Sequence, residues 1–319
     1  MNQTFGGSQE LRVSSMSWEA DGVLSLVLVS PNGAALPAWQ PGAHVDLCLP
    51  SGDVRQYSLC GDPSDLAQYR VAVLREQPSR GASHYVHERL RPGHSVTVTG
   101  PRNNFQFGLA ERYLFIAGGI GITPLLPMVR QAESNGAEWT LLYGGRRRVS
   151  MAFLDELGEF GSRVVVRPQE EFGLLDLHNW LGEPGNGLKV YCCGPEPLLA
   201  AVEDLCALWP ANSLQIERFT PKSRRVDSGP GKSFDVICNR SGERVTVGSR
   251  TSVLEALRTS GLDLPSSCEE GVCGTCETRI LEGAAEHRDS VLSATERESN
   301  ESMLICVSRA ESDVLVLDL

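Results

Sequence analysis

The sequence has few of the features that mark membrane, secreted or nucleic-acid-binding proteins. Its 319 residues contain no apolar run of about 18 residues, which is the length of a membrane-spanning helix. Residues 1–10 lack the basic and then apolar pattern of a secretory signal. Residues 233–319 contain no lysine, and 16 acidic residues there outnumber 8 arginines, a balance that does not suit nucleic acid. We therefore expect a cytoplasmic protein that binds neither a membrane nor nucleic acid.

Cysteine is the residue that occurs in an ordered pattern. Cys268, Cys273 and Cys276 follow a C-x4-C-x2-C spacing, and Cys306 follows after a gap of 29 residues. This is the ligand spacing of plant-type [2Fe-2S] clusters. A zinc site would favour two paired C-x2-C units, and the other six cysteines are too scattered for a disulfide framework. The sequence predicts an iron–sulfur cluster held by these four thiolates.

The first hundred residues predict an antiparallel β-barrel. Strand-like runs at residues 23–29, 44–49, 69–74 and 95–98 are separated by turn signals. Two segments, both interpreted as loops, have side chains suited to a phosphate and a planar ring. One is residues 55–59, Arg-Gln-Tyr-Ser-Leu. The other is residues 80–83, where we expect Ser83 to be the N-cap of a helix over residues 84–90.

From residue 112 onward the pattern changes to alternating strands and helices. An apolar run at residues 113–117 leads into Gly118, Gly119 and Gly121, and a helical stretch follows at residues 125–133. A buried strand, a glycine turn and a helix begin an α/β nucleotide-binding unit. Further strands are expected at 139–143, 163–166 and 189–193, with helices at 151–160 and 196–208. This alternation predicts a parallel sheet.

Two short segments of this region each allow two interpretations of their role. Cys193, Gly194 and Pro195 end a strand at the carboxyl edge of the sheet, where such folds bind ligands, so Cys193 could lie beside a nicotinamide or be a buried structural thiol. Residues 146–148 are three arginines that could contact an adenosine 2′-phosphate or form a solvated loop. The sequence leaves the choice between NADH and NADPH open.

The domain boundaries follow from composition. Residues 220–232 are polar, basic and rich in proline and glycine, which is typical of a linker. Two strands and a helix are expected at 234–238, 244–247 and 252–259, an order that resembles the β-grasp fold of plant-type ferredoxins. The expected architecture is a barrel domain at 1–108, an α/β domain at 109–222, a linker at 223–232 and a ferredoxin-like domain at 233–319.

Five motifs together resemble the phthalate dioxygenase reductase family, whose plan the vanillate O-demethylase reductases share. They are residues 55–59, 81–83, 118–124, 191–195 and the cysteine loop, in that order, and the similarity covers essentially the whole chain. The resemblance implies an iron–sulfur flavoprotein oxidoreductase with an FMN barrel, an NADH domain and a [2Fe-2S] domain. FMN is expected rather than FAD on the family plan alone.

The resemblance also implies the site residues. FMN would be held by Arg55, Gln56, Tyr57, Ser58, Ala72, Val73, Leu74, Gly81, Ser83 and Thr123, with Phe219 covering the flavin ring. Leu74 is a departure, because phthalate-type members carry Lys there. The nucleotide would contact Gly118, Gly119, Gly121, Cys193, Gly194 and Pro195. Thr123, Cys193 and Phe219 are the residues expected at the reacting centre.

The implied function is electron transfer to an oxygenase. A nicotinamide donates two electrons as a hydride and a [2Fe-2S] cluster accepts one, so the flavin between them must divide the pair. The six histidines form neither a Cys-x-His pair for a Rieske centre nor an evident mononuclear iron triad. A Rieske-type terminal oxygenase acting on a phthalate- or vanillate-like aromatic would therefore be a separate polypeptide. We expect it to dock transiently on the acidic C-terminal domain of a monomeric reductase.

Two alternatives to this function stay open at this point. One is a reductase of diffusible acceptors such as ferric chelates or free flavins, for which a ferredoxin domain is unnecessary. The other is a redox sensor that uses the cluster as a switch, which the flavin and nicotinamide motifs do not favour.

Overall fold

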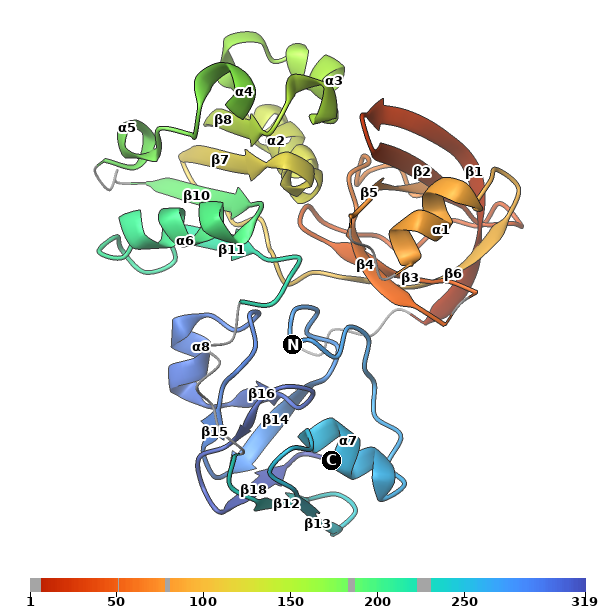
Figure 1. The fold of residues 1–319 in the computed structure, drawn as a ribbon, viewed down its shortest axis with the longest axis vertical. Coiled ribbons are helices and arrows are strands. Elements are labelled where there is room, and N and C mark those ends of the chain that lie inside the picture. The colour runs from red at the N-terminus through yellow and green to blue at the C-terminus, as the bar shows by residue number, and fades with distance from the viewer. Residues whose placement is uncertain (1–6, 51, 78–80, 183–186, 223–230) are drawn as a thin grey trace. The chain divides into compact units, whose positions relative to one another are not determined.

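The chain divides into two compact units, Met1–Glu217 and Arg218–Leu319, in a computed structural model (Figure 1). It describes residues 7–50, 52–77, 81–182, 187–222 and 231–319. Most of the predicted linker, and Arg80 of the second barrel motif, fall outside these ranges. Within them, no helix is both long and apolar enough to cross a membrane.

The first part of the chain forms the predicted antiparallel barrel. Its elements are β1 (Ser8–Ala20), β2 (Val23–Val29), β3 (His44–Cys48), β4 (Val54–Ser58), β5 (Gln68–Leu74), α1 (Ala82–Glu88) and β6 (Ser95–Arg102). The strand order is β4-β3-β6-β1-β2-β5, and a bridge between Leu59 and Val71 brings the two ends of the sheet together. Closing the sheet leaves few unpaired strand edges.

Two parts of this barrel differ from the sequence expectations. β1 was not expected, because most of its side chains are exposed or half-buried and its apolar alternation is weak. Residues 55–59 were interpreted as a loop, but residues 54–58 are strand β4, paired with β3 along its whole length. The backbone hydrogen bonds of the ladder, which local sequence does not reveal, decide the conformation here.

A parallel α/β sheet follows, as predicted. Its elements are β7 (Arg112–Gly118), η1 (Gly119–Gly121), α2 (Ile122–Ser134), β8 (Glu138–Gly145), η2 (Arg148–Ser150), α3 (Leu154–Gly158), η3 (Gly161–Arg163), β9 (Val164–Pro168), α4 (Gln169–Phe172), α5 (Leu177–Leu181), β10 (Leu188–Cys193), α6 (Glu196–Leu205) and β11 (Leu214–Glu217). The order is β11-β10-β7-β8-β9. The helix expected over 151–160 is only α3, because Phe153, at φ 64°, adopts the left-handed conformation and delays its start.

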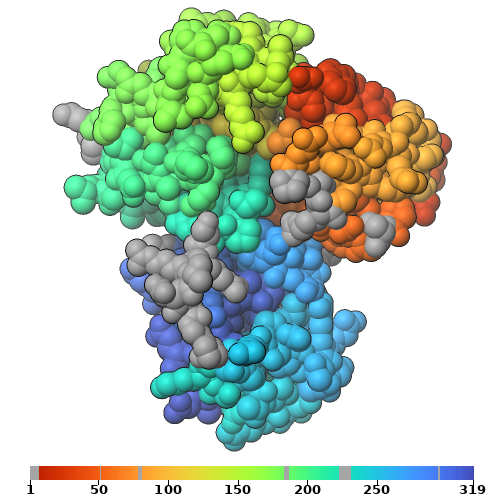
Figure 2. Space-filling view, in the orientation of Figure 1, coloured from red at the N-terminus to blue at the C-terminus, as the bar shows by residue number. Residues whose placement is uncertain are grey.

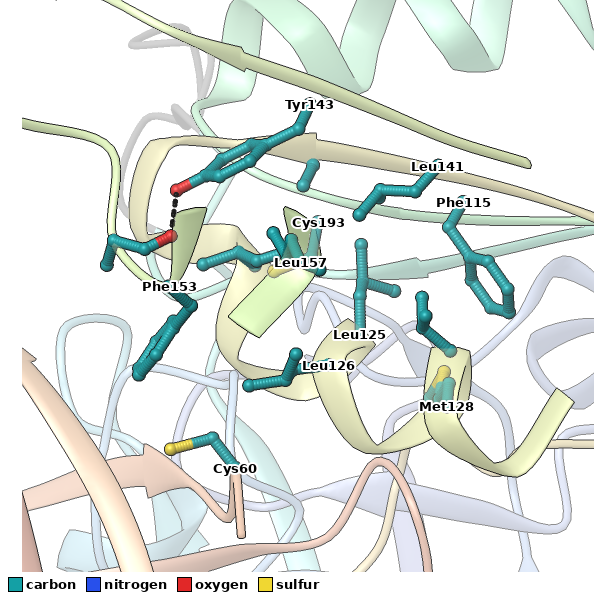
Figure 3. Packing of buried hydrophobic residues seen from close by; sticks show 14 of the residues in the cluster. Cys60, Phe115, Leu125, Leu126, Met128, Leu141, Tyr143, Phe153, Leu157 and Cys193 are labelled. Atoms are coloured by element: carbon teal, nitrogen blue, oxygen red, sulfur yellow. Dashed lines mark hydrogen bonds between the residues drawn. The ribbon is translucent and has the colours of Figure 1, made fainter. Parts of the chain in front are cut away.

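A single apolar cluster joins the barrel to this sheet within the first unit (Figure 3). Cys60 and Ala72 of the barrel are buried in the same cluster as Leu125 and Leu126 of α2 and Leu141 of β8. Fully burying a large apolar side chain stabilises a fold by about 1.5–3 kcal/mol. The shared core therefore holds the barrel and the sheet as one compact unit.

The second unit has the β-grasp order of a plant-type ferredoxin. Figure 2 shows this unit in cyan and blue. Its elements are β12 (Phe234–Cys238), β13 (Arg244–Val247), α7 (Val253–Thr259), β14 (Glu277–Glu282), β15 (Ala285–Glu286), α8 (Ala294–Ser299), β16 (Ser302–Leu304), β17 (Arg309–Ala310) and β18 (Val314–Leu317). The main sheet has the order β13-β12-β18-β14-β16. Ser252 caps α7 by accepting the Glu255 N–H at 3.1 Å.

A buried ion pair links β3 and β6 of the barrel. Arg102 Nη2 lies 2.6 Å from Asp46 Oδ1, and both side chains are about 5% exposed (5% and 4%). Gln56 Nε2 donates to the same oxygen at 2.9 Å. Burial, together with the charge of Arg102, lowers the pKa of the neighbouring His44 to about 4, so His44 is neutral at pH 7. The pair is thus buried with a neutral histidine beside it.

We predict that Asp46→Ala destabilises the protein strongly. Removing one partner leaves the Arg102 charge buried without compensation, which costs about 3–5 kcal/mol. Glu88→Ala breaks an exposed pair with Arg75 and is the matched control, with an expected cost below about 1 kcal/mol. Urea denaturation followed by circular dichroism measures both. Equal losses of unfolding free energy in the two variants would contradict the stabilising role of the buried Asp46–Arg102 pair.

Candidate functional site

The two barrel motifs meet at the start of β4 and of α1. Arg55 Nη2 lies 3.2 Å from Asp53 Oδ1, and a Cβ built on Gly81 would lie 3.9 Å from the other oxygen of Asp53. Arg55 Nη1 also donates to the Val54 carbonyl at 2.8 Å. Among the described residues, these two bonds use two of the five N–H donors of a half-buried guanidinium. The remaining donors suit the phosphate of FMN.

Ser83 is not the helix cap that the sequence suggested. Gly81, at φ +112°, is the N-cap of α1, so the helix begins earlier than expected. Only glycine adopts this backbone conformation without strain. Ser83 lies inside the first turn, buried, and its Oγ accepts the backbone N–H of Glu76 at 3.3 Å. Ser83 still lies beside the Arg55 motif, but its hydroxyl has a partner in the protein.

The other predicted FMN residues divide into two groups. Tyr57 packs its half-buried ring against the barrel core, and burial raises its pKa to about 12. Leu74 is 37% exposed, so it too is accessible. In contrast, Gln56 is bonded to Asp46, while Ala72 and Val73 are buried. None of these three side chains is therefore free for a ligand, and the Val73 carbonyl lies 2.9 Å from His87 Nε2.

The nucleotide motifs meet where the strand order of the sheet reverses, between β7 and β10. A Cβ on Gly118 would lie 2.6 Å from Pro195 Cδ, and one on Gly194 would lie 2.9 Å from the Gly118 Cα. A Cβ on Gly121 would overlap the Cys193 carbonyl. These glycines are thus needed for one turn to pack on the other. Gly119 differs: it has φ +55°, and a Cβ there would meet open space. The point where the strand order reverses is where open α/β sheets bind dinucleotides.

Thr123 and Cys193 are both enclosed by protein. The Thr123 side chain is 3% exposed and its Oγ1 donates to the Ile120 carbonyl at 3.0 Å, which closes the turn before α2. Cys193 is fully buried at the end of β10, and burial raises the pKa of its thiol well above the ordinary value. Cys193 is therefore a neutral thiol, and Cys192 beside it is equally buried. Phe219 is 41% exposed and belongs to the second unit.

A residue that sequence reasoning missed, Glu217, completes this edge. It ends β11, next to Cys193 on β10, and accepts the Ser58 hydroxyl at 3.5 Å from the end of β4. Burial raises the pKa of Glu217 to about 8, although the hydrogen bond from Ser58 opposes this. Strand β11 is short and half-buried, so its pattern is weak. The sequence feature that could have identified Glu217 was a carboxyl group at the end of an expected parallel strand.

The four predicted cluster ligands form two pairs. The thiol of Cys268 is hydrogen-bonded to that of Cys273, and Cys306 to Cys276. In the part of the chain that the structure describes, no three His, Cys, Asp or Glu side chains form a group suited to one metal ion. Two pairs of thiols, in contrast, fit a cluster of two irons that takes four cysteines.

Backbone and hydroxyl donors surround these sulfurs. The Glu270 N–H donates to Cys268 Sγ at 3.3 Å, and Thr275 Oγ1 lies 3.2 Å from Cys273 Sγ. Gly271, at φ +75°, packs against Val307 and Asp289, where a Cβ on it would lie 2.6 Å from Val307 Cγ2. The cluster loop is therefore tight, with donors close to the sulfur atoms of two of the cysteines.

We predict that Glu217→Gln changes the pH dependence of stability. Wild-type Glu217 has a raised pKa, so the native state keeps a proton that the unfolded state loses above about pH 4.5. The contribution of Glu217 to the free energy of unfolding falls as pH rises from about 4.5 to 8 and is then constant. The Gln variant should gain melting temperature relative to wild type between pH 5 and pH 8. A constant difference over this range would contradict the raised pKa.

Comparison with known proteins agrees with this geometry. Residues 236–311 match the model of a 2Fe-2S iron–sulfur cluster binding domain. The chain is 40% identical to the phthalate 4,5-dioxygenase oxygenase reductase subunit of Pseudomonas putida, over 98% of this chain and 97% of that protein.

Two solved structures are similar over nearly the whole chain. Phthalate dioxygenase reductase, described as a modular structure for electron transfer from pyridine nucleotides to [2Fe-2S], is 35% identical with a TM-score of 0.72 and 98% of both chains covered. An intact type IV self-sufficient cytochrome P450 monooxygenase is 42% identical with a TM-score of 0.93. The match covers 98% of this chain but only 41% of the cytochrome P450 chain. From these similarities and the geometry of its sites, the chain belongs to the phthalate dioxygenase reductase family of iron–sulfur flavoprotein oxidoreductases.

Proposed function

We propose that the chain is the reductase component of an oxygenase system. It passes electrons from NADH through FMN and the [2Fe-2S] cluster to a Rieske-type terminal oxygenase that acts on an aromatic, phthalate- or vanillate-like substrate. The observation that carries this proposal is the presence of a flavin motif, a pair of glycine turns at the strand-order reversal and paired cluster thiols in one chain. FMN, when bound, takes up two electrons together and releases them singly.

The barrel residues position the flavin. Arg55, beside Asp53 and close to the start of α1, would hold its phosphate, and the half-buried ring of Tyr57 would pack against its ring system. The Ser58 hydroxyl, at the end of β4, is held by Glu217 Oε2. Because Glu217 has a pKa of about 8, this carboxyl group largely keeps its proton at pH 7 and adds little negative charge.

The α/β residues receive the nicotinamide coenzyme. Gly119 leaves open space for its pyrophosphate at the turn after β7, and Gly118, Gly121 and Gly194 allow the two turns to pack. Cys193 and Pro195 bound the crevice on the β10 side. The buried thiol of Cys193 is neutral and would add no charge beside the nicotinamide. We assign the barrel to residues 1–108, this domain to 109–222, the linker to 223–232 and the ferredoxin domain to 233–319.

Electrons leave through the ferredoxin-like unit. Cys306 lines a hollow that it shares with α7, where the charged side chains are Glu255, Arg258 and Glu269. Arg258 Nη1 lies 2.6 Å from Glu269 Oε1, so the net charge of this group is negative. A basic partner would dock here transiently, with salt-dependent rates, onto a monomeric reductase.

A second acceptor is favoured by one observation. The similarity to the self-sufficient cytochrome P450 exceeds that to phthalate dioxygenase reductase in both identity and TM-score. A haem domain could therefore be the acceptor in place of a Rieske centre. Both acceptors take single electrons, so the sites of this chain would serve either one unchanged.

We predict that Arg55→Ala releases the flavin. The substitution removes the cation of the phosphate site, so purified Arg55→Ala should retain well under half of the FMN that wild type retains after gel filtration, measured by flavin absorbance. Arg75→Ala, a charge change on the same barrel, should retain FMN like wild type. Full retention in Arg55→Ala would refute the assignment.

The proposed function is tested by anaerobic stopped-flow transfer. We expect that protein reduced with NADH is rapidly reoxidised by one member of a panel of oxidised Rieske oxygenases and P450 haem proteins. Cys306→Ser should keep NADH-dependent bleaching of the flavin and lose transfer to the acceptor, whereas Cys48→Ser, whose half-buried thiol lies on β3, should keep both. Equal transfer to ferric chelates by wild type and Cys306→Ser would instead support a diffusible-acceptor reductase.

A further inference from the structure

A row of four alternating charges crosses the boundary between the barrel and the parallel sheet. On the barrel side, Arg70 Nη2 of β5 lies 2.8 Å from Glu19 Oε1 of β1. Arg70 Nη1 lies 2.7 Å from Glu156 Oε1 of α3, in the α/β part of the chain. Arg130 Nη2, from α2, donates to the other oxygen of Glu156 at 2.5 Å. One guanidinium thus joins two carboxylates from different sides of the boundary.

The surroundings of Arg70 fix the direction of its side chain. Its guanidinium carbon lies 4.8 Å from the centre of the Phe153 ring, which is buried in the core that the barrel and the sheet share (Figure 3). The Arg70 carbonyl accepts the Cys60 N–H at 2.8 Å and the Cys60 thiol at 3.4 Å. Because the Arg70 side chain is only 21% exposed, solvent screens its two ion pairs incompletely.

Arg70 is the member of this row whose loss separates the two sides of the boundary. Without it, Glu19 would keep the Ser25 hydroxyl, which donates to its Oε1 at 2.5 Å, and Glu156 would keep Arg130. Each side should therefore retain its own fold. The shared apolar core would still hold the two sides together, but apolar burial has no direction and allows packed surfaces to slide slightly. The bonds of Arg70 are directional and oppose such sliding.

The elements that Arg70 joins carry the two ends of the proposed hydride path. β5 carries Ala72 and Val73 of the predicted flavin site, just after Arg70, and α2 follows the glycine turn of the proposed coenzyme site. We propose that Arg70 is a positioning residue for hydride transfer, which aligns the flavin barrel with the coenzyme-binding sheet by holding Glu19 and Glu156 together. The inference rests on the proposed function. A misplacement of about 1 Å can slow a reaction about a hundredfold, so a small shift is measurable.

The test compares variants of the full-length protein carrying flavin and cluster. Anaerobic stopped flow gives the rate constant of flavin reduction at saturating NADH and the apparent dissociation constant of NADH. We expect Arg70→Met to lower the rate constant at least about tenfold, with FMN content and dissociation constant within about twofold of wild type. The matched control is Asp21→Asn, which weakens an exposed pair with Arg147 across the same boundary and should change the rate constant less than about twofold. An unchanged rate constant in Arg70→Met would overturn the proposal.

A spectroscopic measurement separates positioning from a loss of stability. NAD⁺ added to the dithionite-reduced protein gives a long-wavelength charge-transfer absorbance, which depends on how closely the two rings stack and requires no turnover. We expect this absorbance to weaken in Arg70→Met and to stay unchanged in Asp21→Asn. A normal absorbance together with a lowered melting temperature would make the role of Arg70 structural and overturn the proposal.

A double variant tests the bond to Glu156 itself. Glu156→Gln should also slow flavin reduction, and Arg70→Met/Glu156→Gln should be no more than about twofold slower than the slower single variant, because both changes break the same bond. Losses that multiply would overturn the bridge between the two residues. If NADH failed to reduce the flavin of wild type, the proposed function itself would fall. If NADH reduced it and Arg70→Met matched wild type, only the positioning role would.

Discussion

The packing of the barrel against the parallel sheet is the interaction on which the flavin side of the site depends. Cys60 and Ala72 from the barrel share one buried cluster with Leu125 and Leu126 of α2. This contact fixes the end of β4 beside the ends of β10 and β11. Ser58 can then reach Glu217, 159 residues away in the chain. Apolar burial, which has no direction of its own, thus places a directional hydrogen bond.

The same burial keeps the titratable groups at this edge of the sheet uncharged. The carboxyl group of Glu217 and the thiol of Cys193 both have raised pKa values, because desolvation disfavours their charged forms. An edge with polar groups and little negative charge suits a coenzyme that carries phosphates. The buried charges of the barrel, Asp46 and Arg102, form an ion pair with each other instead. Position in the fold therefore decides which acids ionise.

The cluster loop shows a different constraint, because its ligands come from two distant segments. Cys268, Cys273 and Cys276 lie on one tight turn, while Cys306 follows β16 and approaches Cys276. Gly271 permits this approach by packing directly on Val307. The loop thereby forms two thiol pairs, and nearby N–H and O–H donors can offset the charge of bound thiolates.

The sequence alone determined the features that depend on local spacing. The cysteine intervals, the glycine turn of residues 118–121 and the alternation of strands and helices each reflect a short-range requirement, and a family resemblance added the flavin motif. Tertiary structure decided the rest, because it depends on which distant segments meet. It made residues 54–58 a strand, moved the cap of α1 to Gly81 and brought Glu217 to Ser58. It also paired Arg148, one of the three consecutive arginines, with Glu171, because the β8–β9 register brings these two residues together.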